Sequence, residues 1–95
     1  MNKKQIQIRE AELQTLKNLK SFEEITSLKL IRQFEDDHRQ CADVKVNGIK
    51  VAFYYHDDLG FLTYLHDSLT AKKHFWEAFK NAIEIEEMNL DDERE

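Results

Sequence analysis

The dipeptide Asn47-Gly48 is the feature that most limits how this chain can fold. It lies at the centre of VKVNGIKV, where apolar residues alternate with lysines on both sides. Both central residues of a type I′ turn need a positive φ, which Asn and Gly tolerate best, so this dipeptide favours a two-residue hairpin loop. Because a two-residue loop sets the register of its strands, the sequence predicts an antiparallel hairpin around this turn.

The predicted register divides the hairpin into two faces. Val46 opposes Ile49 and Lys45 opposes Lys50, and the pairing continues outward to Ala42 and Phe53. The face expected to be apolar carries Ala42, Val44, Val46, Ile49, Val51 and Phe53, with Tyr55 at its end. The face expected to be polar and wet carries Cys41, Asp43, Lys45, Lys50, Ala52 and Tyr54. This alternation is typical of an antiparallel sheet with one face in water.

Two helices are expected before the hairpin. The first covers residues 3–19, where apolar residues recur at helical spacing. The second begins near Phe22 and covers residues 22–35, because Ser21 and Glu24 have the spacing of a capping box. Alternation in SLKLIRQF leaves a strand as the other interpretation of this segment, which would pair with residues 42–46.

Residues 61–65, FLTYL, are expected to return as a third strand, although a helix that starts at Asp57 is the competing interpretation. A C-terminal helix then follows a cap at Asp67, Ser68 or Thr70. Its main apolar stripe contains Leu69, Phe75, Trp76, Phe79, Ala82, Ile83 and Leu90. A second, weaker stripe contains Ala78, Ile85 and Met88. The acidic tail at about residues 89–95 is expected to fray.

These elements predict a single α+β domain over residues 1–95. Their order is α-α-β-β-β-α: a small antiparallel β-meander with two N-terminal helices and one C-terminal helix. A domain of this size buries only about 60–65% of the surface of its unfolded chain, so some apolar surface is left over. A two-fold homodimer is a second way to bury that surface.

Composition excludes several classes of protein. There is no run of 18 apolar residues and no secretory signal pattern, so we expect no membrane segment and a cytoplasmic location. A single cysteine cannot form an internal disulfide. Two glycines and no proline leave no Gly-rich phosphate loop, and no motif for a cofactor is present.

Charge favours protein binding as the function. The net charge is −5, and it is uneven, with +3 over residues 1–34 and −8 over residues 35–95. We expect a small non-enzymatic module of the inhibitor, accessory or immunity and anti-defence type, as phages and mobile elements encode. It would block a basic or nucleic-acid-handling site on a partner protein. In the extreme case it would be a DNA mimic, which presents carboxylates as DNA presents phosphates. The expected contact residues are Tyr54, Tyr55, Asp57, Asp58, Asp67, Glu84, Glu86 and Glu87.

Two other functions have some support in the sequence. His56-Asp57 and His66-Asp67 could bind a metal or move a proton in a small enzyme, but their spacing is unspecific and we expect no metal site. Lys45 and Lys50 on the hairpin, with Tyr54 nearby, could bind nucleic acid weakly. Two lysines are fewer than the clustered basic footprint of such proteins, so direct binding of nucleic acid is not the expectation.

Overall fold

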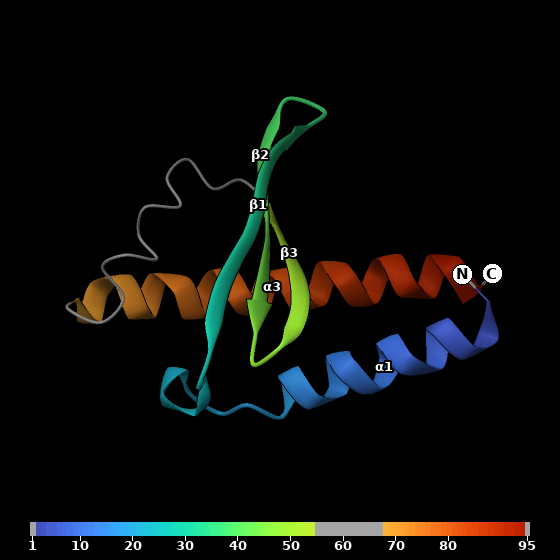
Figure 1. Ribbon diagram of the computed structural model, residues 1–95, viewed down its shortest axis with the longest axis horizontal. Helices are drawn as coiled ribbons and strands as arrows, with labels where there is room; N and C mark the ends of the chain where they lie inside the picture. The colour runs from blue at the N-terminus through green and yellow to red at the C-terminus, as the bar shows by residue number, and fades with distance from the viewer. Residues whose placement is uncertain (1, 55–67, 95) are drawn as a thin grey trace.

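A computed structural model of the chain describes residues 2–54 and 68–94, and it has an α+β architecture. Its elements, in chain order, are α1 (Lys3–Lys17), the short 3₁₀ turn η1 (Phe22–Glu24), β1 (Leu28–Asp36), β2 (Arg39–Val46), β3 (Ile49–Tyr54) and α3 (Leu69–Arg94). The three strands form one antiparallel sheet in the order β1-β2-β3. Figure 1 shows the strands running across α3, with α1 beside that helix.

The hairpin of β2 and β3 confirms the predicted register at every pair. Val46 lies opposite Ile49, Lys45 opposite Lys50, and the ladder continues to Cys41 and Tyr54. Asn47 and Gly48 have φ values of 51° and 83°, as a type I′ turn requires. The Asn-Gly signal was therefore sufficient to predict both the turn and the residues that share each face.

The second helix predicted over residues 22–35 is wrong. Only η1 is helical there, and residues 28–36 form β1, the interpretation that the sequence left open. Ser21 makes no capping bond with its side chain; instead the Glu24 carboxylate accepts a hydrogen bond from the Lys20 N–H, at 3.0 Å. Helix propensity is a weak preference, and pairing with β2 along nearly the whole strand overrides it.

The turn between β1 and β2 consists of Asp37 and His38, which no hairpin signal marks in the sequence. Their φ values are 52° and 65°, so both residues are left-handed, a conformation that is uncommon without glycine. Both side chains are exposed. This end of the β1–β2 pair projects beyond both helices (Figure 1).

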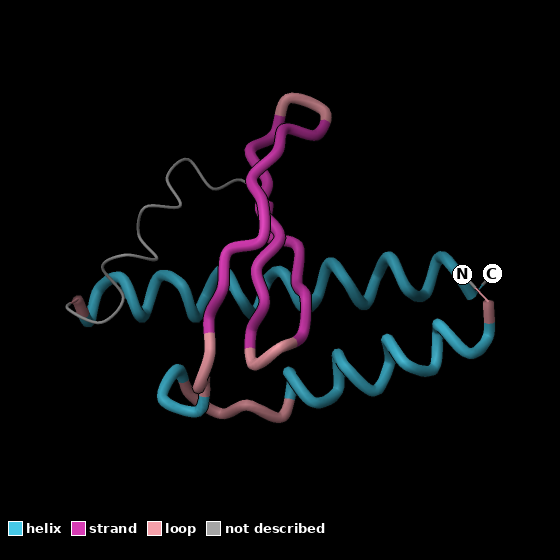
Figure 2. The backbone as a smooth tube through the Cα atoms, in the orientation of Figure 1, coloured by secondary structure: helices cyan, strands magenta, loops and turns pink. Residues whose placement is uncertain are grey.

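One face of the sheet packs against α3, and α1 lies beside α3 (Figure 1). The buried core joins side chains of α1, β2, β3 and α3: Leu13, Leu16, Ala42, Val44, Val46, Val51, Phe53, Phe75, Phe79, Ala82, Ile83 and Leu90. Phe75 is its centre, with ring centroids 5.3 Å from Phe53 and 6.0 Å from Phe22. Figure 2 shows the three strands in front of α3, which fits a core between sheet and helices.

The C-terminal helix was predicted correctly in kind but not in length. Ser68 caps it, because the Ser68 hydroxyl accepts a hydrogen bond from the Ala71 N–H at 3.1 Å. The helix continues to Arg94, through the segment expected to fray, because Leu90 is only 4% exposed and anchors the last turns. Leu69, assigned to the apolar stripe, is 83% exposed. No helix of the described chain is long and apolar enough to cross a membrane.

The third strand predicted at residues 61–65 and the competing helix from Asp57 lie outside the described residues. The described sheet reaches three strands without them, because residues 28–36, expected to be part of a second helix, form β1. The coarse prediction of helices with a three-stranded antiparallel sheet is therefore confirmed, whereas the order α-α-β-β-β-α is not.

The side chain of Asn47 ties the β2–β3 turn to the start of β1. Its Oδ1 atom accepts hydrogen bonds from the Thr26 N–H at 2.7 Å and the Ser27 N–H at 3.1 Å. Its Nδ2 atom donates to the Glu24 carbonyl at 3.3 Å. Asn47 therefore has two roles, since it adopts the backbone conformation of one turn and holds the segment that leads into the neighbouring strand.

Replacing Asn47 separates these two roles. Asn47→Gly keeps a turn-compatible backbone but loses the side-chain bonds, so we expect the free energy of unfolding to fall by about 1–2 kcal/mol. Asn47→Asp is the matched control, because it keeps the acceptor atoms and loses only the donor to Glu24. Urea unfolding measures both. Equal losses in the two variants would show that the bonds to Thr26 and Ser27 contribute little.

The turn at Asp37-His38 gives a second prediction. His38→Gly removes a side chain from a left-handed position, so we expect stabilisation by about 0.5–1 kcal/mol. Gln40→Gly is the control, because this exposed position lies within β2, where glycine should destabilise by about 0.5–1 kcal/mol. A higher urea midpoint for His38→Gly alone is the expected result. A lower midpoint would show that the His38 side chain stabilises the turn.

Candidate functional site

Half of the predicted contact residues lie outside the described chain. These are Tyr55, Asp57, Asp58 and Asp67, and the same holds for His56 and His66, the histidines of the alternative metal or acid–base function. Within residues 2–54 and 68–94, no three histidine, cysteine or carboxylate side chains are grouped closely enough to hold a metal ion. The remaining predicted residues, Tyr54, Glu84, Glu86 and Glu87, can be placed.

Glu86 lies between α1 and the open edge of β3. Its Oε2 atom is 2.9 Å from Arg9 Nη2, and its Oε1 atom accepts a hydrogen bond from the Ala52 N–H at 3.1 Å. Both charged side chains are largely buried, with 13% of Arg9 and 18% of Glu86 exposed. The outward N–H groups of an edge strand need partners, and Glu86 supplies one. This carboxylate is therefore already used within the fold.

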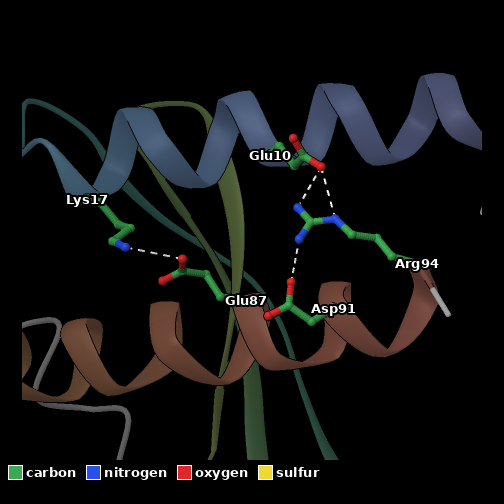
Figure 3. Close-up of polar contacts among 5 residues, drawn as sticks. All are labelled: Glu10, Lys17, Glu87, Asp91 and Arg94. Atoms are coloured by element: carbon green, nitrogen blue, oxygen red, sulfur yellow. Dashed lines mark hydrogen bonds and ion pairs between the residues drawn. The ribbon is translucent and has the colours of Figure 1, made fainter.

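Glu87 and the end of α3 also pair with α1, as Figure 3 shows. Lys17 Nζ lies 3.2 Å from Glu87 Oε2. Two turns further along α3, Arg94 Nε donates to Glu10 at 3.0 Å, and the same guanidinium contacts Asp91. These exposed pairs each contribute little free energy, but together they align the antiparallel helices.

Tyr54, the last residue of β3, is half-buried beside α3. The Arg39 guanidinium lies 5.3 Å from the centre of its ring. Burial raises the pKa of the Tyr54 hydroxyl above its usual value, and the negative charge of Glu86 adds to the rise. Tyr54 therefore remains a neutral hydrogen-bonding group at physiological pH, with part of its ring accessible.

A groove lies between Tyr54 and the outer face of α3. Its volume is about 450 Å³, and its lining includes Tyr54, His74, Glu77, Ala78, Asn81, Ala82, Glu84, Ile85 and Met88. The helix residues follow the spacing of one helical face. The second apolar stripe of the sequence analysis, Ala78, Ile85 and Met88, therefore faces this groove, and Met88 is 65% exposed.

Glu77 and Glu84 lie on the same groove and are exposed. Neither forms an ion pair with another residue of the described chain, in contrast to Glu86 and Glu87. Of the three glutamates predicted as contacts on α3, Glu84 is the one whose carboxylate remains available. Glu77 was not predicted as a contact residue. It lies seven residues before Glu84, on the same helical face, and this spacing was the signal that could have found it.

The outer face of the sheet, away from the helices, differs from its prediction. Cys41 and Asp43 were expected to lie in solvent, yet they are only 1% and 5% exposed. β1 causes both changes, because Phe34 lies opposite Cys41 and Arg32 opposite Asp43. Arg32 Nε is 2.8 Å from Asp43 Oδ2, so this carboxylate pairs with β1 and not with a lysine of the hairpin.

β1 also adds a third lysine to this face. Lys29 lies opposite Lys45, which lies opposite Lys50, so three exposed lysines form one row across the sheet. A register shift between Leu30 and Arg32 produces this alignment. If the pairing that begins at the Asp37-His38 turn continued without a shift, Lys29 would lie opposite Val46 and point to the core. The shift is a β-bulge, which no residue pattern in this stretch predicts.

The different roles of Glu84 and Glu86 can be measured. Glu86→Ala leaves Arg9 and the Ala52 N–H without this partner in a largely buried place, so we expect a loss of about 2 kcal/mol in the free energy of unfolding. Glu84→Ala changes an exposed side chain of the same helix and should cost less than about 0.5 kcal/mol. Similar losses in urea unfolding would contradict the assignment.

Comparison with known proteins identifies no relative of this chain. No protein-family model, curated protein or solved structure matches the chain significantly.

Proposed function

We propose that this protein is a small, non-enzymatic protein-binding module, and that the groove between Tyr54 and α3 is its contact surface. The observation that carries the proposal is the combination of a partly exposed apolar stripe with two exposed carboxylates. Met88 and Ile85 provide the apolar contact, while Glu77 and Glu84 lie on the same helical face. A partner segment with an apolar side chain flanked by lysine or arginine would match both features.

The residue types of the groove favour a protein as the ligand. Methionine is flexible and polarizable, which suits surfaces that adapt to a partner. Tyrosine with a partly exposed ring is typical of residues that dominate binding energy at interfaces. The groove also carries polar side chains at its rim, which a peptide segment can engage by hydrogen bonds and charge.

The mechanism that fits this surface is blocking. A small protein that covers a basic site on its partner excludes other ligands by size and competes for the same cations by charge. An inhibitor, accessory or immunity-type factor works in this way. A partner with a basic, nucleic-acid-handling site is the class that a protein of net charge −5 would approach most readily.

Charge reversal on the groove tests the proposal. The bait would be the purified protein, in a lysate of the native host at low and high salt. We expect the unmodified protein to retain a basic protein that high salt releases, because salt screens contacts between exposed charges. Glu77→Lys combined with Glu84→Lys should weaken the measured affinity for that partner by about tenfold or more.

The control variant carries the same change of charge elsewhere. Glu23 and Asp92 are exposed and do not line the groove. Glu23→Lys combined with Asp92→Lys should therefore bind the partner almost as well as the unmodified protein. Met88→Ala should weaken binding without altering its dependence on salt, since this contact is apolar. Equal retention by all variants would exclude the groove as the contact surface.

A further inference from the structure

The row of Lys29, Lys45 and Lys50 has no counter-charge in the described part of the chain. None of the three forms an ion pair there, and all three are exposed. Adjacent strands are about 4.8 Å apart, so the row places three positive charges across about 10 Å. Like charges directly opposite each other destabilise a sheet. An anion bound along the row would remove this repulsion.

The remainder of the same face adds no net charge, because each of its arginines lies opposite an aspartate. The Arg32–Asp43 pair forms the next row, and Arg39 lies opposite Asp36 near the turn. The acidic side chains of α3 described above belong to a helix that packs against the other face of the sheet. The outer face is therefore positive although the whole chain is negative, and a ligand that approaches it meets the local charge first.

Two aromatic rings lie on this face, each with a guanidinium over it. Arg32 is 4.4 Å from the centre of the Phe34 ring, and Arg39 is 5.3 Å from that of Tyr54. Aromatic rings and guanidinium planes are the surfaces on which proteins stack the unpaired bases of nucleic acids. Phe34 and Tyr54 flank Cys41, about 13 Å along β2 from the lysine row.

We propose that the outer face of the sheet binds single-stranded nucleic acid. Phosphates lie along Lys29, Lys45 and Lys50, and a base stacks on the Arg32–Phe34 pair. Aromatic groups beside the cations favour this ligand over an acidic polypeptide, which offers carboxylates but no bases. The site adjoins the groove on α3, because Tyr54 lies on this face beside Arg39 and also lines the groove. The sequence showed only two of the three lysines, since β1 contributes Lys29.

Fluorescence anisotropy with a labelled oligothymidine or oligouridine of about 12 nucleotides tests the site. The measurement covers salt concentrations from about 50 to about 200 mM. The test variant combines Lys29→Gln, Lys45→Gln and Lys50→Gln. We expect its affinity to fall by at least about tenfold and the slope of log affinity against log salt to flatten by about 2, because three phosphate contacts are lost.

The matched control removes three exposed lysines elsewhere: Lys3→Gln, Lys4→Gln and Lys73→Gln. It changes the net charge equally, so it should keep most of the affinity and the slope. The melting temperature of the test variant should equal or exceed that of the unmodified protein, because a repulsive row is removed. Equal binding by both variants, or no saturable binding by the unmodified protein, would overturn the proposal.

Two further measurements identify the ligand class. Phe34→Ala should weaken binding without changing the salt slope, since stacking releases no counterions. Polyglutamate should compete with the labelled oligonucleotide far less well than an unlabelled oligonucleotide of equal charge. If polyglutamate competes equally and Phe34→Ala has no effect, the face binds acidic polypeptides and the assignment to nucleic acid is wrong.

Discussion

The turn at Asn47-Gly48 is the constraint on which the rest of the sheet depends. Its geometry sets the pairing of β2 with β3 and thereby decides that the valines and Phe53 face the helices. The Asn47 side chain then holds residues 24–27 at the start of β1. This turn and the Asn47 side chain therefore determine the register of one strand pair and the place where the third strand begins.

The bulge at Ile31 is the second constraint, and it decides the chemistry of the outer face. Before the bulge, Leu28 and Leu30 lie opposite Val46 and Val44 and share their face. After it, Arg32 lies opposite Asp43. One extra residue therefore places Leu28 and Leu30 on the face of the valines, and Lys29 and Arg32 on the outer face. Without it, the pairing that begins at the Asp37-His38 turn would place Lys29 opposite Val46. Ile31 itself is 42% exposed, which is a small cost for this arrangement.

Local signals and long-range pairing explain which parts of the structure could be predicted. The hairpin, α1 and the core stripe of α3 depend on turn chemistry and periodicity, which adjacent residues encode. β1 depends on pairing with β2 through a turn of Asp37 and His38, which has no glycine, and on a bulge without a sequence signal. For the same reason, the burial of Cys41 and Asp43 and the addition of Lys29 to the lysine row could not be read from the hairpin alone. The second stripe on α3 was visible in the sequence, but only the structure shows that it faces a groove beside Tyr54.

The fold separates charges that the sequence mixes. Two carboxylates of α3, Glu86 and Glu87, pair with cations of α1. Arg94 of α3 pairs with Glu10 of α1, so charge pairs in both directions align the two helices. Glu77 and Glu84 remain on the outer face of α3, while the unpaired lysines lie on the outer face of the sheet. Pairing between the two helices thus neutralises part of the negative charge of α3. Two smaller surfaces of opposite sign remain.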